Sequence, residues 1–126
     1  MNKFDAPLFQ LYSFFYSKFR EKIYKSFDSV FPQIKIDSQC KYALVARGDA
    51  DLYIRYSGEK YKENIWDHMA GYMVVKEAGG VVVDVTGKEL DFSKGKKLLE
   101  NSGIICANKK IVPKAIQAAN KVHNKL

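Results

Sequence analysis

The chain has 126 residues, of which 47% are hydrophobic and 28% are charged, and its formal net charge is +7. This length gives room for one domain with a real core, and the apolar content excludes an intrinsically disordered chain. No apolar run approaches the roughly 18 residues that a membrane span needs, and no signal peptide is recognisable. We therefore expect a cytoplasmic protein that has no membrane partner.

The first part of the chain is rich in aromatic residues. Seven of the eight phenylalanines precede residue 32, and apolar residues recur at helical spacing through residues 7–27. We therefore expect residues 1–33 to form an aromatic-rich helical segment that ends at Pro32. Its phenylalanine face is either ordinary core or a surface that packs against another polypeptide.

The rest of the chain alternates between strand-like and helical segments. Strands are predicted at residues 34–36, 51–56, 81–85 and 103–107, and helices at residues 38–47, 66–78 and 111–122. Gly48 follows the first of these helices, as a C-terminal cap does. The alternation predicts a single α/β domain over residues 1–126, with a layered sheet flanked by helices.

The two cysteines lie in apolar stretches. Neither Cys40 nor Cys106 has a neighbouring Cys or His at the spacing of metal ligands. We interpret both as buried free thiols, which suit a reducing cytosol.

The positive charge is concentrated in the last third of the chain. Residues 88–126 carry nine basic and three acidic residues. Basic tails often bind nucleic acid, but these lysines are not interleaved with arginines or with a series of aromatic residues, so we do not expect a nucleic-acid partner. Attraction of a small anionic substrate is a better use of the same charge.

Four residues that could carry chemistry lie at the ends of predicted elements: Ser38, Lys41, Arg55 and Asp67. Helix starts present free backbone N–H groups, so the turn at Ser38 could hold a phosphate to which Lys41 and Arg55 donate charge-assisted hydrogen bonds. Simpler explanations also exist. Ser38 and Asp67 could simply cap their helices and have no further role. Lys41 and Arg55 could simply be solvated cations on the surface.

Four sequence motifs at residues 37–42, 48–55, 65–71 and 77–80 occur in order at matching spacings. Together they resemble the C-terminal half of the lithium-sensitive, magnesium-dependent phosphatase superfamily, which includes the inositol monophosphatases. The resemblance covers roughly residues 20–118. Within the superfamily, the chain looks most similar to 3′(2′),5′-bisphosphate nucleotidases, which convert adenosine 3′,5′-bisphosphate into AMP and phosphate.

The resemblance implies a role for each candidate residue. Asp67 would bind an active-site Mg²⁺ beside the cleaved phosphate, in keeping with the oxygen ligands that this cation prefers. Ser38, Lys41 and Arg55 would hold the nucleotide and its second phosphate. Inositol monophosphatases carry a carboxylate in place of Arg55, so the guanidinium favours the nucleotidases. His68 varies within the family, and we expect it to have a packing or surface role.

The chain departs from the family in one large respect. It lacks the upstream glutamate and the Asp-Pro-Ile-Asp-Gly-Thr-type motif that supply most metal ligands. The resemblance therefore implies that residues 34–126 form the substrate-binding C-terminal domain and that the N-terminal metal-binding domain is absent. We expect weak Mg²⁺ binding and little activity from this polypeptide alone, because metal-assisted hydrolysis needs a complete metal site.

Several alternatives remain open. A separate N-terminal half or partner chain could pack on the phenylalanine-rich helix and complete the enzyme. The chain could instead be a fragment that resembles inositol monophosphatase or inositol polyphosphate 1-phosphatase. It could also be a non-catalytic remnant that binds an anion or a protein.

Overall fold

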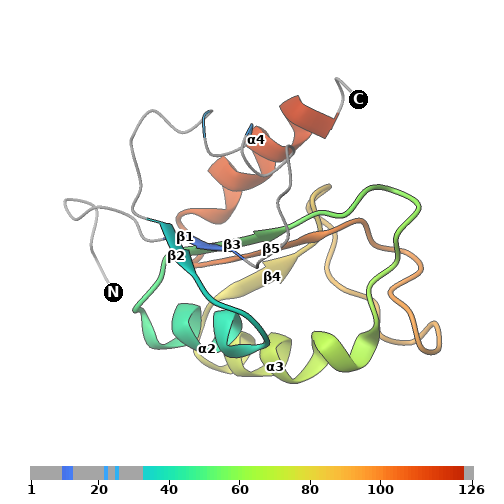
Figure 1. Cartoon of the computed structure of the whole chain (residues 1–126), viewed down its shortest axis with the longest axis horizontal. Coiled ribbons are helices and arrows are strands. Elements are labelled where there is room, and N and C mark those ends of the chain that lie inside the picture. Colours follow the sequence, from blue (N-terminus) through green and yellow to red (C-terminus); the bar gives the residue numbers. More distant parts are fainter. Residues whose placement is uncertain (1–9, 13–21, 23–24, 26–32, 124–126) are drawn as a thin grey trace.

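The computed structural model of the chain describes residues 10–12, 22, 25 and 33–123. At its centre lies a mixed sheet, whose five strands follow the order β2-β1-β3-β5-β4 (Figure 1). The strands are β1 (Gln10–Tyr12), β2 (Gln33–Lys35), β3 (Leu52–Arg55), β4 (Val81–Val83) and β5 (Ile104–Ala107). β1 runs parallel to β2 and β3, whereas β5 is antiparallel to β3 and β4.

Helices cover both faces of this sheet. α2 (Cys40–Arg47) and α3 (Met69–Glu77) lie side by side on one face, and α4 (Val112–His123) lies on the other (Figure 1). A short 3-10 turn, η1 (Ile65–Asp67), leads into α3. The predicted layered α/β fold is thus confirmed. In the described part of the chain, no helix is long and apolar enough to cross a bilayer.

The sheet buries side chains on both faces, which gives two apolar cores. Leu52 and Ile54 of β3 belong to the core beside α4, whereas Tyr53 belongs to the core beside α2 and α3. The first core also contains Val83, Ile105, Ala115 and Ala119, and the second also contains Tyr42, Val45, Val75 and Ile104. Successive residues of a strand point to opposite faces, which is why neighbouring β3 side chains belong to different cores.

Two glycines set the end of α2 and its distance from α3. Gly48 caps α2 with a left-handed φ of 83°, and its N–H donates to the carbonyls of Leu44 and Val45. Glycine adopts this conformation readily because it has no Cβ, which confirms the predicted stop at Gly48. Within α3, a Cβ at Gly71 would overlap the ring of Tyr42. Gly71 therefore permits the close approach of the two helices.

The structure corrects the prediction for the first part of the chain. Residues 10–12, which the spacing over residues 7–27 placed in a helix, form strand β1 between β2 and β3. A local apolar pattern does not reveal this strand, because its hydrogen-bonding partners lie far away in the sequence. Lys22 and Lys25 are helical. The phenylalanine face predicted for residues 1–33 lies outside the described residues.

Two helices also start later than predicted. The helix predicted from residue 38 begins at Cys40, and the helix predicted from residue 66 begins as η1 and becomes α-helical at Met69. Both cysteines are free, but Cys40 is exposed, so the prediction of two buried thiols is wrong for Cys40 and confirmed for Cys106. Cys40 is exposed because the buried side of α2 is formed by later residues, among them Tyr42 and Val45.

Candidate functional site

The N-terminal ends of α2 and α3 lie together at one end of the sheet. Gln39, just before α2, joins them through its side-chain amide. Its Nε2 donates to the carbonyl oxygen of Trp66 at 3.1 Å, and its Oε1 accepts from the backbone N–H of Gly71 at 2.8 Å. The turns that carry Ser38 and Asp67 are therefore neighbours in space, although they are distant in the sequence.

Ser38 lies in the turn that leads into α2. Its φ is 66°, a left-handed value that is uncommon for residues other than glycine. Its Oγ accepts a hydrogen bond from the backbone N–H of Cys40 at 3.2 Å. Ser38 thus satisfies one of the free N–H groups at the start of α2, which is the simpler role considered from the sequence. Strained backbone of this kind occurs preferentially at functional sites.

Lys41 is buried rather than solvated. Its side chain is 5% exposed, and its Nζ lies 3.8 Å from the exposed carboxylate of Asp37 and 5.3 Å from the centre of the Tyr53 ring. Burial lowers the pKa of Lys41; the charge of Asp37 opposes this effect and the nearby charge of Arg55 adds to it. The alternative of a solvated cation is therefore wrong for Lys41.

Arg55, at the end of β3, is held by a buried carboxylate. Its Nε donates to Oε1 of Glu63 at 2.7 Å, and the two side chains are 26% and 5% exposed. Burial would lower the pKa of Arg55, but the hydrogen bond and the charge of Glu63 raise it above its usual value. Arg55 therefore stays cationic, half-buried and close to Lys41.

The same carboxylate binds His68. Its Oε2 lies 3.0 Å from Nε2 of His68, whose Nδ1 lies 2.6 Å from the hydroxyl of the buried Tyr42. A carboxylate only accepts hydrogen bonds, so Nε2 carries the proton, and in the neutral ring Nδ1 accepts from Tyr42. His68 is itself buried, which confirms the predicted packing role and excludes the surface role. Neither Glu63 nor Tyr42 was recognised from the sequence, which carries no local signal for this contact.

Asp67 lies in η1, two residues before α3, and not in the first turn of that helix as predicted. Its side chain is exposed, and its Oδ2 accepts a hydrogen bond from Nδ2 of Asn64 at 3.2 Å. His68, the residue before α3, makes no side-chain hydrogen bond to the helix start, where Oε1 of Gln39 accepts from the N–H of Gly71 instead, so Asp67 is not the residue that caps α3. Among the described residues, no group of three or more His, Cys, Asp or Glu side chains could hold a metal ion.

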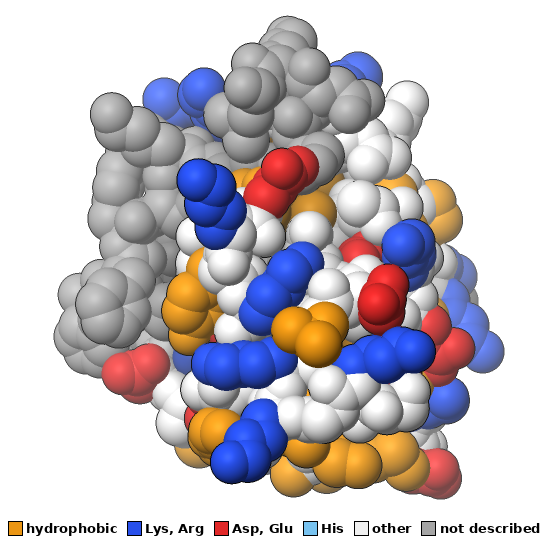
Figure 2. Space-filling model, turned by 90° about the vertical axis from the view of Figure 1, so that its right-hand side faces the viewer, with side chains coloured by type: hydrophobic (Ala, Val, Ile, Leu, Met, Phe, Trp, Pro, Cys, Tyr) orange, Lys and Arg blue, Asp and Glu red, His pale blue; other side chains and the backbone are white. Residues whose placement is uncertain are grey.

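Basic and acidic side chains both lie on the side of the molecule formed by two loops (Figure 2). Figure 2 shows Lys and Arg side chains spread over the side formed by the loops before η1 and after β4. One of these loops is bound directly to η1: the N–H of Ile65 donates to the carbonyl of Lys96 at 3.0 Å, and Nζ of Lys97 donates to Oδ1 of Asn64 at 2.5 Å. Acidic side chains lie among these basic ones (Figure 2), so an anion that approaches Asp67 and Arg55 would meet a surface of mixed charge.

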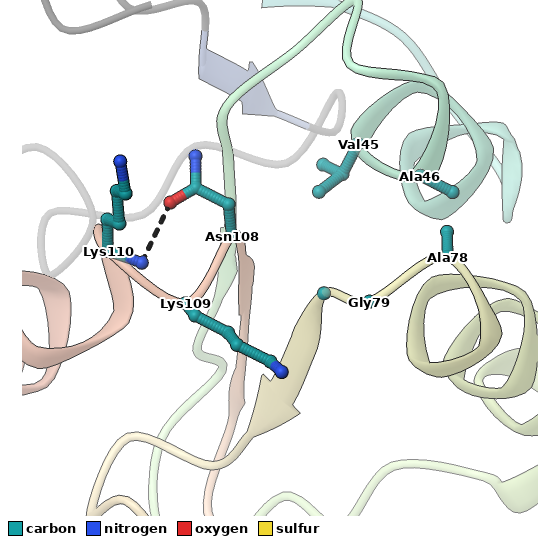
Figure 3. Close-up of a pocket in the computed structure, with 8 residues that line it drawn as sticks. Val45, Ala46, Ala78, Gly79, Asn108, Lys109 and Lys110 are labelled. Atoms are coloured by element: carbon teal, nitrogen blue, oxygen red, sulfur yellow. Dashed lines mark hydrogen bonds between the residues drawn. The ribbon is translucent and has the colours of Figure 1, made fainter. Parts of the chain in front are cut away.

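A hollow of about 240 Å³ lies at the other end of α2 and α3 (Figure 3). Its lining comes from the C-terminal ends of these helices and from the turn before α4, with Val45, Ala46, Ala78, Gly79, Gly80, Asn108, Lys109 and Lys110. It contains none of the four residues predicted from the sequence. Helix C-termini also carry partial negative charge, which disfavours a bound phosphate.

Known proteins with similar sequences share one family. The model of the inositol monophosphatase family matches residues 12–124. A curated 3′(2′),5′-bisphosphate nucleotidase of Dictyostelium discoideum is 55% identical over 89 residues, which cover 71% of this chain and 27% of that protein. A protein of the same name from Oryza sativa is 51% identical over 96 residues, with 74% and 27% covered. The chain therefore spans about a quarter of the length of these curated relatives.

Solved structures share the fold. An IMPase of Thermotoga maritima superposes with a TM-score of 0.71 at 24% identity, over 94% of this chain and 42% of that chain. CysQ from Bacteroides thetaiotaomicron, described as a bacterial member of the inositol monophosphatase family, gives a TM-score of 0.67 at 21% identity, over 82% and 38%. The expected resemblance to part of the inositol monophosphatase-like fold is confirmed.

Proposed function

Since this chain belongs to the inositol monophosphatase family, we propose that it is the substrate-binding portion of a Mg²⁺-dependent phosphatase of the bisphosphate nucleotidase type. The substrate would be adenosine 3′,5′-bisphosphate and the products AMP and phosphate. Curated relatives at 55% and 51% identity carry the name of this nucleotidase. That name favours a nucleotide bisphosphate over an inositol phosphate.

The observation that carries the proposal is the pair of cations formed by Lys41 and Arg55. Both lie close together at the end of the sheet, and the pKa of Lys41 is lowered by burial and by the charge of Arg55. The carboxylate bound to Arg55 also accepts from His68, and the carboxylate nearest Lys41 is the exposed Asp37. A phosphate dianion could accept charge-assisted hydrogen bonds from Nζ of Lys41 and from the terminal nitrogens of Arg55.

Asp67 and Ser38 complete the proposed binding site. An exposed carboxylate at the end of η1 suits Mg²⁺, which usually takes one or two protein carboxylates together with phosphate oxygens and waters. When bound, Mg²⁺ would act as a Lewis acid and as an activator of water. Ser38 would present its hydroxyl and the start of α2 to the nucleotide. The resemblance to the family supports these roles, and so does the junction that Gln39 forms between the two turns.

We also propose that this polypeptide alone hydrolyses little or no substrate. Asp67 is a single ligand, and the described residues offer no cluster that could complete a metal site around it. A polypeptide that carries the missing carboxylates would have to supply the remaining ligands. Binding without turnover is therefore the expected behaviour of the isolated chain in the presence of Mg²⁺.

The test compares binding of adenosine 3′,5′-bisphosphate with binding of AMP. Arg55→Glu should lower the affinity for the bisphosphate by about tenfold or more and the affinity for AMP much less, because the second phosphate of the bisphosphate loses its charged partner. Arg47→Glu is the matched control, since Arg47 lies on the surface with a 73% exposed side chain and pairs with Asp49. It should leave both affinities unchanged.

Two results would contradict the proposal. Equal losses for both ligands in Arg55→Glu would remove the assignment to bisphosphate nucleotidases. Robust phosphate release by the purified 126-residue chain would show that its metal site is complete, and would overturn the proposed lack of activity.

A second candidate function, a protein-binding module, is favoured by the surface of α3. Trp66, Met69, Met73 and Val74 are 58%, 47%, 46% and 51% exposed. Met69 and Met73 are four residues apart and so lie on one side of α3, Val74 lies beside Met73, and Trp66 lies in η1 just before the helix. Exposed apolar surface of this kind marks contacts with other polypeptides. This role is compatible with the first, because the partner could be the remaining portion of the phosphatase.

A further inference from the structure

We propose that Glu63 is a positioning residue that fixes Arg55 and the Asp67 turn relative to each other, by dividing the two oxygens of one buried carboxylate between Arg55 and His68. This inference rests on the proposed function, which assigns Arg55 to the second phosphate and Asp67 to the metal. It adds a residue that touches neither ligand but determines how both groups meet them.

Glu63 is held firmly in its loop. Its backbone carbonyl accepts a hydrogen bond at 2.9 Å from the N–H of Leu98, which is 1% exposed. Next to it, Nζ of Lys62 donates to the carbonyl of Asn101 at 3.0 Å. The side chain of Glu63 is 5% exposed. A buried carboxylate on such a fixed backbone has little freedom to move. We therefore expect its position to determine the positions of Arg55 and His68.

One oxygen of Glu63 orients Arg55. Oε1 accepts from Nε at 2.7 Å, and Oε2 is directed to His68. Glu63 therefore does not form the two-bonded fork in which a carboxylate takes up two nitrogens of a guanidinium. The bond at Nε fixes the plane of the guanidinium at its root and leaves the terminal nitrogens to other acceptors. The hydroxyl of Tyr53 is one such acceptor, and a phosphate would be another.

The other oxygen fixes the turn that carries Asp67. His68 follows Asp67 directly and is bound at both ring nitrogens, by Glu63 and by Tyr42. Its backbone is fixed as well, because its N–H donates to the carbonyl of Ile65 and its carbonyl accepts from the N–H of Tyr72. The place of Asp67 is therefore tied through His68 to the same carboxylate that orients Arg55.

Glu63 is ionised under ordinary conditions. Burial would raise its pKa, but the hydrogen bonds from His68 and Arg55 outweigh burial and hold the pKa below its usual value. A charged carboxylate is therefore available both to balance Arg55 and to select the Nε2–H form of His68.

The test uses Glu63→Gln in the 126-residue chain. Glutamine keeps the size of the side chain and an acceptor for Arg55, but its amide donates to His68 and carries no charge. We expect the affinity for adenosine 3′,5′-bisphosphate to fall about tenfold and that for AMP much less. We also expect nitrogen NMR shifts to report a change of the neutral His68 ring from the Nε2–H to the Nδ1–H form.

Glu89→Gln is the matched control for loss of a negative charge. Glu89 is an exposed carboxylate that accepts from Tyr72 and Lys76, away from Arg55. It should leave both affinities and the His68 ring unchanged. If Glu63→Gln does not fold, Glu63→Asp takes its place: it keeps the charge but is one methylene shorter, and the same selective loss is expected.

Arg55→Gln separates the two proposals. The deciding quantity is the ratio of the affinity for adenosine 3′,5′-bisphosphate to the affinity for AMP. If Arg55→Gln lowers this ratio while the Glu63 variants leave it unchanged, the positioning role of Glu63 is overturned and the proposed function stands. An equal loss of both ligands in the Glu63 variants, with the His68 form unchanged, also overturns it, because that pattern reports only a structural role. If Arg55→Gln leaves the ratio unchanged, the proposed function fails first.

Discussion

Lys41 lies in an environment that is unusual for a lysine. Its side chain is 5% exposed, its partner Asp37 is 3.8 Å away, and the Arg55 guanidinium is a second nearby cation. Each of these features apart from Asp37 disfavours the charged ammonium. The fold therefore holds a lysine where part of its surroundings disfavours the charged form, and a bound phosphate, as proposed, would offset this cost.

This environment predicts how ligand binding depends on pH. Burial lowers the pKa of Lys41 from the ordinary lysine value of 10.5, so the ammonium loses its proton at a lower pH than an ordinary lysine. Because the phosphate needs the charged form, the affinity for adenosine 3′,5′-bisphosphate should decline at alkaline pH, beginning below 10.5. Binding titrations across this range measure the decline.

Lys41→Arg provides the comparison, because a guanidinium keeps its proton throughout this range. The affinity of this variant for adenosine 3′,5′-bisphosphate should stay constant over the alkaline pH range in which the affinity of the wild type falls. A wild-type profile that is flat up to the ordinary lysine pKa would show that the charge of Lys41 does not contribute to binding.

Among the elements, those with local signals were predictable from the sequence. The strand-like segment at residues 51–56 predicted β3, and Gly48 predicted the end of α2, because both patterns can be recognised locally in the sequence. Strand β1 was not predictable, since its partners β2 and β3 lie elsewhere in the chain. The same limit applies to Glu63, whose burial depends on contacts with β3, His68 and Leu98.

The contact between α2 and α3 gives a prediction about stability. Gly→Ala inside a helix normally stabilises a protein by roughly 0.5–1 kcal/mol. At Gly71 we expect the opposite sign, a loss of about 2 kcal/mol, because the added methyl group would overlap the Tyr42 ring and force the helices apart. Urea unfolding of Gly71→Ala measures the change.

Ala70→Gly is the neighbouring control. Ala70 is exposed on the same helix, so its replacement should cost only the ordinary helical penalty of about 1 kcal/mol. A gain in stability for Gly71→Ala would mean that the two helices do not approach each other as closely as described. Because Tyr42 also binds His68, Gly71→Ala should weaken ligand binding as well.

For the molecule as a whole, the most prominent unexplained surface is the apolar side of α3. Figure 2 shows hydrophobic side chains along its lower edge, the side on which α3 lies in Figure 1. Trp66, Met69, Met73 and Val74 are each about half exposed. This surface continues directly into Asp67, so a polypeptide that covers it would also be placed to contribute ligands to a metal bound there.

This arrangement predicts that complementation should bury Trp66. The part of the Dictyostelium discoideum relative that this chain does not match, added as a separate polypeptide, should bind the apolar side of α3. Trp66 is the only tryptophan of the chain and is 58% exposed, so a version of the added polypeptide without tryptophan leaves it as the sole reporter. Its fluorescence should shift to shorter wavelengths, and Mg²⁺-dependent phosphate release should appear with the same concentration dependence.

Met73→Lys tests whether that surface is the one that binds. A lysine in the middle of the apolar side should abolish both the fluorescence shift and the phosphate release, because its charge would lose water without gaining a partner. Leu99→Lys is the matched control: Leu99 is 51% exposed but lies outside α3, so this variant should behave as the wild type. Activity that appears without any change at Trp66 would place the complementing polypeptide on another surface and leave the apolar side of α3 to a different partner.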